Sequence, residues 1–161
     1  MKYSELIENT TKRVNDLPMI FAFSNEQLDN ALDDMGLSLK DMKGDKLIRM
    51  GIGAFCLKSD LDHIMSELHA VEDMKREFIE DYEHAYDAFF YEMGNHEYHI
   101  NYEGDWDVLS CFGLDDGVCE YEDGKDVDEY MDAMGLSPVT KAAYHDARGD
   151  FLRMADEKDW Y

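Results

Sequence analysis

Basic residues are scarce in the middle of this chain, where residues 60–132 hold 24 acidic side chains and only three basic ones. The whole chain has a formal net charge of −23 at pH 7, so nearly all of its excess negative charge lies in this segment. Such a surface repels nucleic acid, anionic lipid and phosphorylated metabolites, and it attracts cations and basic proteins. We therefore expect no direct binding to DNA or RNA, and we expect a basic protein as the partner.

Long apolar runs and cysteines are also missing or few. No stretch of 18 apolar residues occurs, and the segment Met1–Glu5 lacks the apolar core of a signal peptide, so we expect no membrane span and no export. Three cysteines are too few for a disulfide framework or a paired-cysteine zinc site. These absences favour a location in the reducing cytoplasm.

The apolar periodicity predicts an α+β fold in a single domain over residues 1–161. The expected sheet is small, mostly antiparallel and three- or four-stranded, and it packs on one long helix over residues 59–93, with additional short helices. We expect an acidic loop near residues 115–128 and a helical C-terminal segment over residues 127–156. The predicted strands lie near residues 19–23, 46–50, 54–58 and 97–102.

A glycine followed by leucine occurs three times at the predicted end of a helix. Gly36, Gly113 and Gly135 stand in these positions. A left-handed glycine with an apolar residue behind it is a frequent way to end a helix. The three copies therefore predict repeated capping rather than a repeat architecture.

The strongest enzymatic candidate is the group His96, Glu97 and His99, because two imidazoles and a carboxylate can ligate a metal or transfer protons. The histidines are three residues apart rather than four, and on a strand they would point to opposite faces. We expect a structural role for them, with no cofactor. A metal-dependent or acid–base enzyme built on these residues stays the alternative.

The acidic segment has a sharper interpretation as an imitation of nucleic acid. A helix over residues 59–93 would be about 52 Å long, and its 11 acids would give one charge per ~5 Å, against one per ~1.7 Å in duplex DNA. The duplex density is approached only if the 13 acids of residues 97–132 lie on the same side. The expected partner contacts are Asp73, Glu77, Glu80, Asp81, Glu83, Asp87, Glu120, Glu122 and Asp123.

Several segments resemble a family of uncharacterised small proteins encoded by bacteriophages, plasmids and integrative elements of bacteria. The resemblance rests on Pro18–Gln27, the Met35-Gly36-Leu37 helix end, Gly51–Phe55 and Phe89–Tyr98. The Asn-His-Glu-Tyr sequence within Phe89–Tyr98 is its most distinctive part. The resemblance implies that the gene lies on a mobile element. Such elements carry many small acidic proteins that block host nucleases, including restriction and CRISPR enzymes.

Charge and resemblance together predict a protein that is not an enzyme. We expect an acidic accessory protein of a mobile element that binds a basic nucleic-acid-handling protein of the bacterial host, such as a defence nuclease, and inhibits it by nucleic-acid mimicry. An interaction module whose charge only confers solubility, as a monomer or a homodimer, is a further alternative.

Overall fold

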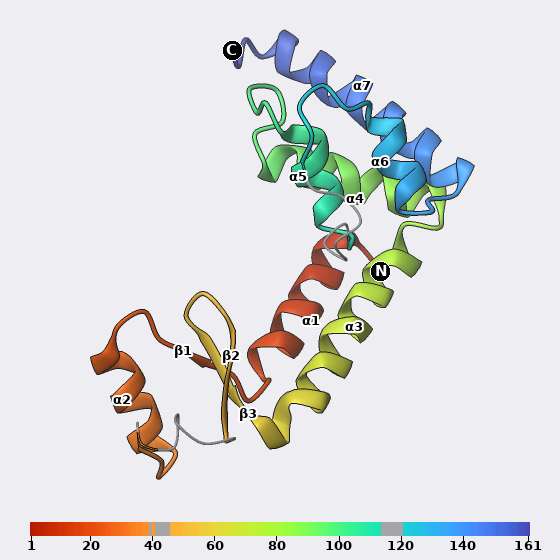
Figure 1. Ribbon diagram of the computed structural model, residues 1–161. Helices are drawn as coiled ribbons and strands as arrows, with labels where there is room; N and C mark the ends of the chain where they lie inside the picture. Colours follow the sequence, from red (N-terminus) through yellow and green to blue (C-terminus); the bar gives the residue numbers. More distant parts are fainter. Residues whose placement is uncertain (39, 41–45, 114–120) are drawn as a thin grey trace. The chain divides into compact units, whose positions relative to one another are not determined.

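The computed structural model describes residues 1–38, 40, 46–113 and 121–161, and the chain divides into two compact units (Figure 1). One domain over residues 1–161 stays a prediction. One unit is formed by Thr10–Ala70 and is called the sheet unit below. The other is formed by Met1–Asn9 together with Val71–Tyr161 and is called the helical unit. Each unit is described by itself.

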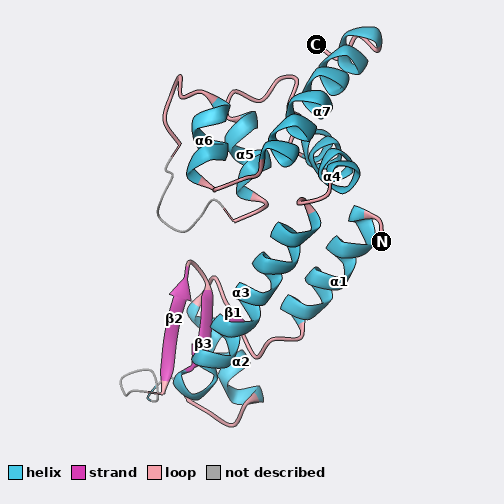
Figure 2. Cartoon of the chain, turned by 90° about the vertical axis from the view of Figure 1, so that its right-hand side faces the viewer, coloured by secondary structure: helices cyan, strands magenta, loops and turns pink. Residues whose placement is uncertain are grey.

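A three-stranded antiparallel sheet lies in the sheet unit, with the strand order β1-β3-β2 (Figure 2). The hairpin turns at Gly53, whose φ of +72° favours glycine. Three of the four predicted strands are thereby confirmed. Their bounds are Ile20–Phe21 for β1, Leu47–Gly51 for β2 and Ala54–Leu57 for β3.

Helix α2 (Asn25–Asp34) packs on the sheet through Leu28 and Leu32. Its start follows the predicted chemistry, because the Ser24 hydroxyl accepts a hydrogen bond from the Gln27 amide at 3.1 Å. The acceptor satisfies one of the amides that a helix leaves without an internal partner.

The helical unit is built mainly from α4 packed along α7, with α5 and α6 against them (Figure 1). Tyr3 and Leu6 of α1 (Tyr3–Asn15) add two fully buried side chains to this core. None of the helices in the described ranges is long and apolar enough to cross a membrane. The bounds are Leu61–Phe78 for α3, Tyr82–Asn95 for α4, Gly104–Ser110 for α5, Val127–Ala133 for α6 and Pro138–Glu157 for α7.

The continuous helix expected over residues 59–93 is not confirmed, because α3 ends at Phe78 and α4 begins at Tyr82. Asp81 caps the second helix, and its carboxylate accepts hydrogen bonds from the amides of Glu83 and His84 at 3.0 and 3.1 Å. The Ile79 carbonyl accepts a hydrogen bond from the buried Thr140 hydroxyl at 2.7 Å. The interruption is thus stabilised at the start of α4 and by α7.

The prediction of a strand over residues 97–102 is wrong. These residues form successive turns, and Glu97 has a φ of +49°, which no regular strand accommodates. The amides of Ile100 and Asn101 both donate to the Glu97 carbonyl, at 3.0 and 3.1 Å. Local hydrogen bonds have therefore replaced the pairing that the alternating pattern predicted.

The predicted glycine caps are confirmed by the backbone. Gly36, Gly113 and Gly135 have φ values of +71°, +90° and +70°. The amides of Leu37 and Leu136, which follow two of them, reach back to Leu32 and Met131 carbonyls at 2.8 and 3.0 Å, as in a Schellman ending. The helical C-terminal segment is also confirmed, as α6 and α7.

One carboxylate organises the interior of the helical unit. Asp105 Oδ1 accepts hydrogen bonds from the hydroxyls of Tyr98 and Tyr144, both at 2.5 Å, and lies 3.8 Å from Arg148 Nε. Arg148 Nε also donates to the Tyr98 hydroxyl at 2.5 Å. Two helices and the turn between α4 and α5 are thereby joined at one charged group.

Stability is expected to fall as the pH rises above about 10. Burial, and next to it the nearby carboxylates, raise the pKa of Tyr3, Tyr98 and Tyr144. The unfolded chain releases these protons near pH 10, whereas the folded chain keeps them. The contribution of these tyrosines to the free energy of unfolding is therefore complete below about pH 10. Above that pH it is lost, at up to about 1.4 kcal/mol per pH unit for each tyrosine. Urea midpoints at about pH 8, 9.5 and 11 measure this; equal midpoints would contradict it.

Candidate metal centre

The last turn of α4 brings a carboxylate and an imidazole together. Glu92 lies within the helix and His96 caps its C-terminal end. Residues four apart are neighbours on a helix surface, and His96 Nε2 lies 3.6 Å from Glu92 Oε2. The spacing along α4 therefore brings the pair together.

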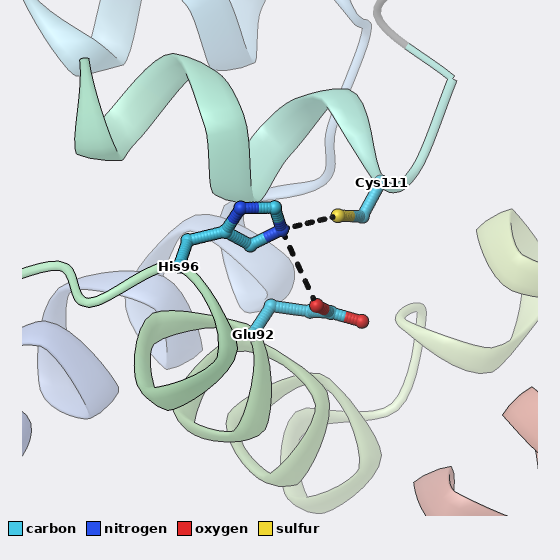
Figure 3. A group of neighbouring side chains, drawn as sticks. All are labelled: Glu92, His96 and Cys111. Atoms are coloured by element: carbon cyan, nitrogen blue, oxygen red, sulfur yellow. Dashed lines mark hydrogen bonds and ion pairs between the residues drawn. The ribbon is translucent and has the colours of Figure 1, made fainter. Parts of the chain in front are cut away.

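A thiol from another helix completes the group. Cys111 follows the C-terminal end of α5, and its Sγ lies 3.3 Å from the same ring nitrogen of His96. Figure 3 shows the imidazole between the sulfur and the carboxylate, with one nitrogen facing both. The three donor atoms all lie within 4.8 Å of one another.

A shell of hydrogen bonds holds these side chains in place. The Tyr3 hydroxyl donates to Glu92 Oε1 at 2.6 Å, and Asn95 Nδ2 donates to Oε2 at 3.1 Å. Asn101 Nδ2 donates to the His96 carbonyl at 3.1 Å. Contacts of this kind orient metal ligands in known sites, where their loss lowers affinity.

The group is closed on one side and accessible on the other. Glu92 is only 3% exposed, whereas the His96 side chain is 30% exposed. Burial, and next to it the negative charge of Glu92, raises the pKa of Cys111 to about 12. Without a cation, Cys111 is therefore a protonated thiol at neutral pH and a poor nucleophile.

The donor types and spacings fit zinc. Bonds of about 2.3 Å to sulfur and about 2.0–2.2 Å to nitrogen and oxygen set tetrahedral donor separations of roughly 3.3–3.6 Å. Two of the observed separations lie in this range, at 3.3 Å for sulfur to nitrogen and 3.6 Å for nitrogen to oxygen, and the third pair, sulfur and oxygen, lies within 4.8 Å. A thiolate, an imidazole and a carboxylate also suit zinc better than calcium or magnesium, which prefer oxygen donors alone.

A thiol–imidazole–carboxylate relay fits the same residues less well. In such a relay, the two ring nitrogens of the histidine have different partners, one the nucleophile and the other the orienting carboxylate. Here both Cys111 and Glu92 face Nε2. Convergence on one point is the arrangement that a bound ion needs.

The predicted histidine group is only partly present at this centre. His96 contributes, but Glu97 is exposed on its turn. The His99 ring lies 5.6 to 6.2 Å from the rings of Phe151, Trp160 and Tyr161, and its buried Nδ1 has no hydrogen-bond partner among the described residues. The structure groups His96 with Glu92 and Cys111 instead.

The predicted acidic contacts occupy the surface of the helical unit. Asp73, Glu77, Glu80, Asp81, Glu83, Asp87, Glu122 and Asp123 are all exposed, whereas Glu120 lies outside the described residues. Two of them also have local structural roles, because Asp81 caps α4 and Asp87 Oδ2 accepts a hydrogen bond from the Tyr3 amide at 3.3 Å.

Sequence reasoning missed two of the three donors. The pair Glu92 and His96 has a readable signal, a carboxylate and a histidine four apart near the end of a predicted helix. Cys111 has none, because its approach depends on how α5 packs against α4.

Comparison with known proteins identifies a family. A family model described as a family of unknown function (DUF7659) matches residues 2–123. The matched segment contains all three donors and the Tyr3 that contacts them, whereas α6 and α7 lie beyond it. No curated protein and no solved structure matches the chain.

Proposed function

The chain belongs to the family of unknown function DUF7659, and we propose that it is a metal-binding protein that holds one zinc ion between Glu92, His96 and Cys111. The observation that carries this proposal is the convergence of three different donor atoms within 4.8 Å of one another. The previously considered metal site of His96, Glu97 and His99 is thereby replaced by one that shares only His96 with it.

The centre is open rather than closed. Three protein donors leave one tetrahedral position for water or a ligand, and the exposed edge of His96 gives access to it. An open position is the arrangement of catalytic zinc sites, in which the ion acts as a Lewis acid or lowers the pKa of bound water. The hydrogen bonds from Tyr3 and Asn95 hold the Glu92 carboxylate, whose Oε2 lies 3.6 Å from His96 Nε2.

A cobalt titration tests the proposal. Chelator-treated protein is expected to bind one equivalent of Co²⁺, with intense visible bands typical of tetrahedral cobalt and a near-ultraviolet band from a thiolate ligand. The three cysteines provide the controls: Cys111→Ser abolishes the thiolate band, whereas Cys56→Ser and Cys119→Ser keep it. Absence of the band in the unmodified protein, or its persistence in Cys111→Ser, would reject the site.

A second candidate function, the binding of a basic protein, is favoured by the distribution of charge between the units. The helical unit has 28 acidic and 8 basic side chains, a net charge of −20, whereas the sheet unit has 10 and 7, a net charge of −3. This supports the proposal that the helical unit of a mobile-element protein occupies the nucleic-acid site of a basic host protein, such as a defence nuclease, in the bacterial cytoplasm.

Charge reversal of Glu77, Glu80 and Asp87 to Lys is expected to weaken binding to a fluorescent deca-arginine peptide by about tenfold, because the local negative potential is removed. Affinity is also expected to fall steeply with salt, since exposed charges are screened beyond ~8 Å at physiological ionic strength. Fluorescence anisotropy in a salt series measures both effects.

The matched control changes the same number of charges in the sheet unit. Reversal of the exposed Glu26, Asp29 and Asp33 to Lys alters the net charge equally. If both triple variants lose the same affinity, the helical unit has no special role. Circular dichroism of both variants verifies that they are folded.

A further inference from the structure

A pocket in the helical unit combines aromatic rings with carboxylates. It has a volume of about 300 Å³ and lies between the segment that begins α5 and the loop that precedes α6. Four rings line it, those of Tyr102, Trp106, Tyr121 and Tyr130. Tyr121 contacts two of the others edge to face, with ring centroids 6.4 Å from Tyr102 and 6.5 Å from Trp106. Tyr130 is only 2% exposed and anchors the wall.

The charge of the pocket is strongly biased. Four carboxylates line it, and Lys125 is the single basic side chain among the lining residues. Asp105 is committed to the buried tyrosines described above, and Asp123 accepts a hydrogen bond from the Tyr102 hydroxyl. Glu103 adds a further exposed carboxylate beside Trp106. Aromatic faces and carboxylates together stabilise a cation that has left water.

The chain already places one ammonium group at this wall. Lys125 Nζ lies 4.9 Å from the centroid of the Tyr130 ring and 3.5 Å from Glu122 Oε1. The Lys125 side chain is only 17% exposed, so its aliphatic part is covered as well. The pocket wall therefore accommodates an alkylammonium group. Lys125 shows how the basic side chain of a partner could lie there.

We propose that this pocket binds a basic side chain of a protein partner, with arginine preferred to lysine. A guanidinium is planar, so it stacks on an aromatic face while its edge donates paired hydrogen bonds to a carboxylate. The ammonium group of lysine is not planar, so it neither stacks on a ring nor donates paired hydrogen bonds to a carboxylate with the same geometry. The inference is independent of the metal centre. It rests on the second proposed function, for which it specifies one anchoring contact.

Trp106 provides a direct readout, because the chain has two tryptophans and Trp160→Phe leaves Trp106 alone. N-acetyl-arginine amide, titrated into this variant at constant ionic strength, is expected to change the fluorescence saturably. The lysine analogue is expected to bind more weakly, and the neutral citrulline analogue is expected to have no effect. A linear response to arginine, or equal responses to arginine and citrulline, would overturn the proposal.

Removal of the resident cation sharpens the test. In the same background, Lys125→Gln is expected to tighten arginine binding at least about threefold, because the competing ammonium is gone. Lys141→Gln is the matched control, since it removes another partly buried lysine, which is 27% exposed and pairs with Asp132, neither residue lining the pocket. Equal effects of the two variants would mean that only the net charge of the protein matters, and they would reject the pocket.

The outcome separates this inference from the second proposed function. Deca-arginine binding without any saturable response to the single amino acid rejects the pocket and leaves the acidic surface standing. A saturable arginine response without deca-arginine discrimination between the two triple variants supports the pocket and rejects the surface.

Discussion

Replacement of Cys111 by serine is expected to weaken Zn²⁺ binding by at least about 100-fold, which exceeds the roughly 10–100-fold that substitutions outside the ligand set cost. The hydroxyl of serine does not supply the soft thiolate that zinc prefers. His96→Gln is expected to have an effect of the same size, because the ring nitrogen lies between the other two donors. Competition with a chromophoric chelator at fixed pH measures the dissociation constants.

Two further variants distinguish a built site from adventitious binding. Tyr3→Phe leaves all three donors in place but removes the 2.6 Å hydrogen bond to Glu92, so we expect a loss within the 10–100-fold range. His99→Gln is the histidine control and is expected to leave the affinity unchanged, because its ring packs among aromatic side chains instead. Equal losses in the His96 and His99 variants would mean that zinc binds elsewhere.

Replacement of Asp105 by alanine is expected to lower the free energy of unfolding by about 3 kcal/mol, because two buried tyrosine hydroxyls are left without their acceptor. The hydroxyls of Tyr98 and Tyr144 lose the oxygen that lies 2.5 Å from each, and Arg148 loses its nearest carboxylate. Tyr144 is completely buried, so its hydroxyl depends on Asp105 for this bond. Urea denaturation at neutral pH measures the change.

Asp146→Ala is the matched control for this effect. Asp146 also accepts a tyrosine hydroxyl, that of Tyr82 at 2.6 Å, but at an exposed position where water substitutes for the carboxylate. A much smaller change in stability is expected. Equal losses for the two aspartates would show that burial does not set the strength of these contacts.

The sequence predicted those parts of the fold that local chemistry determines. The Ser24 cap, the left-handed glycines and the hairpin of β2 and β3 each depend on a few neighbouring residues, and each was found where expected. The α+β class followed from the same signals. In contrast, the break between α3 and α4 depends partly on Thr140, which donates to Ile79 from 61 residues away.

The wrong prediction of a strand over residues 97–102 also has its cause in contacts that are distant in the sequence. The alternation over residues 97–102 does not correspond to one buried face, because only Tyr98 of its three apolar residues is buried. Tyr98 points inward because its hydroxyl joins Asp105 and Arg148, whereas Ile100 and Tyr102 are 61% and 77% exposed. Periodicity alone does not distinguish these two situations.

The candidate centre was predictable only in part. The sequence predicted His96 as a candidate together with its neighbours Glu97 and His99. Its spatial partners are instead a carboxylate one helical turn earlier and a thiol 15 residues later. The same limit applies to the acidic residues. Sequence predicted their exposure, whereas the role of Asp81 as a helix cap required the position where α4 begins.

The helical unit is assembled from two distant parts of the chain, and this affects how it is made. The Tyr3 ring packs on Phe78, Tyr91 and Phe112, and its hydroxyl bonds to Glu92, 89 residues further along. During translation at about 5–20 residues per second, the first turns of α1 are synthesised roughly 5–18 s before that carboxylate. Their apolar stripe is uncovered throughout this interval, so a bulky N-terminal fusion or a bound chaperone would compete with the late docking of Tyr3.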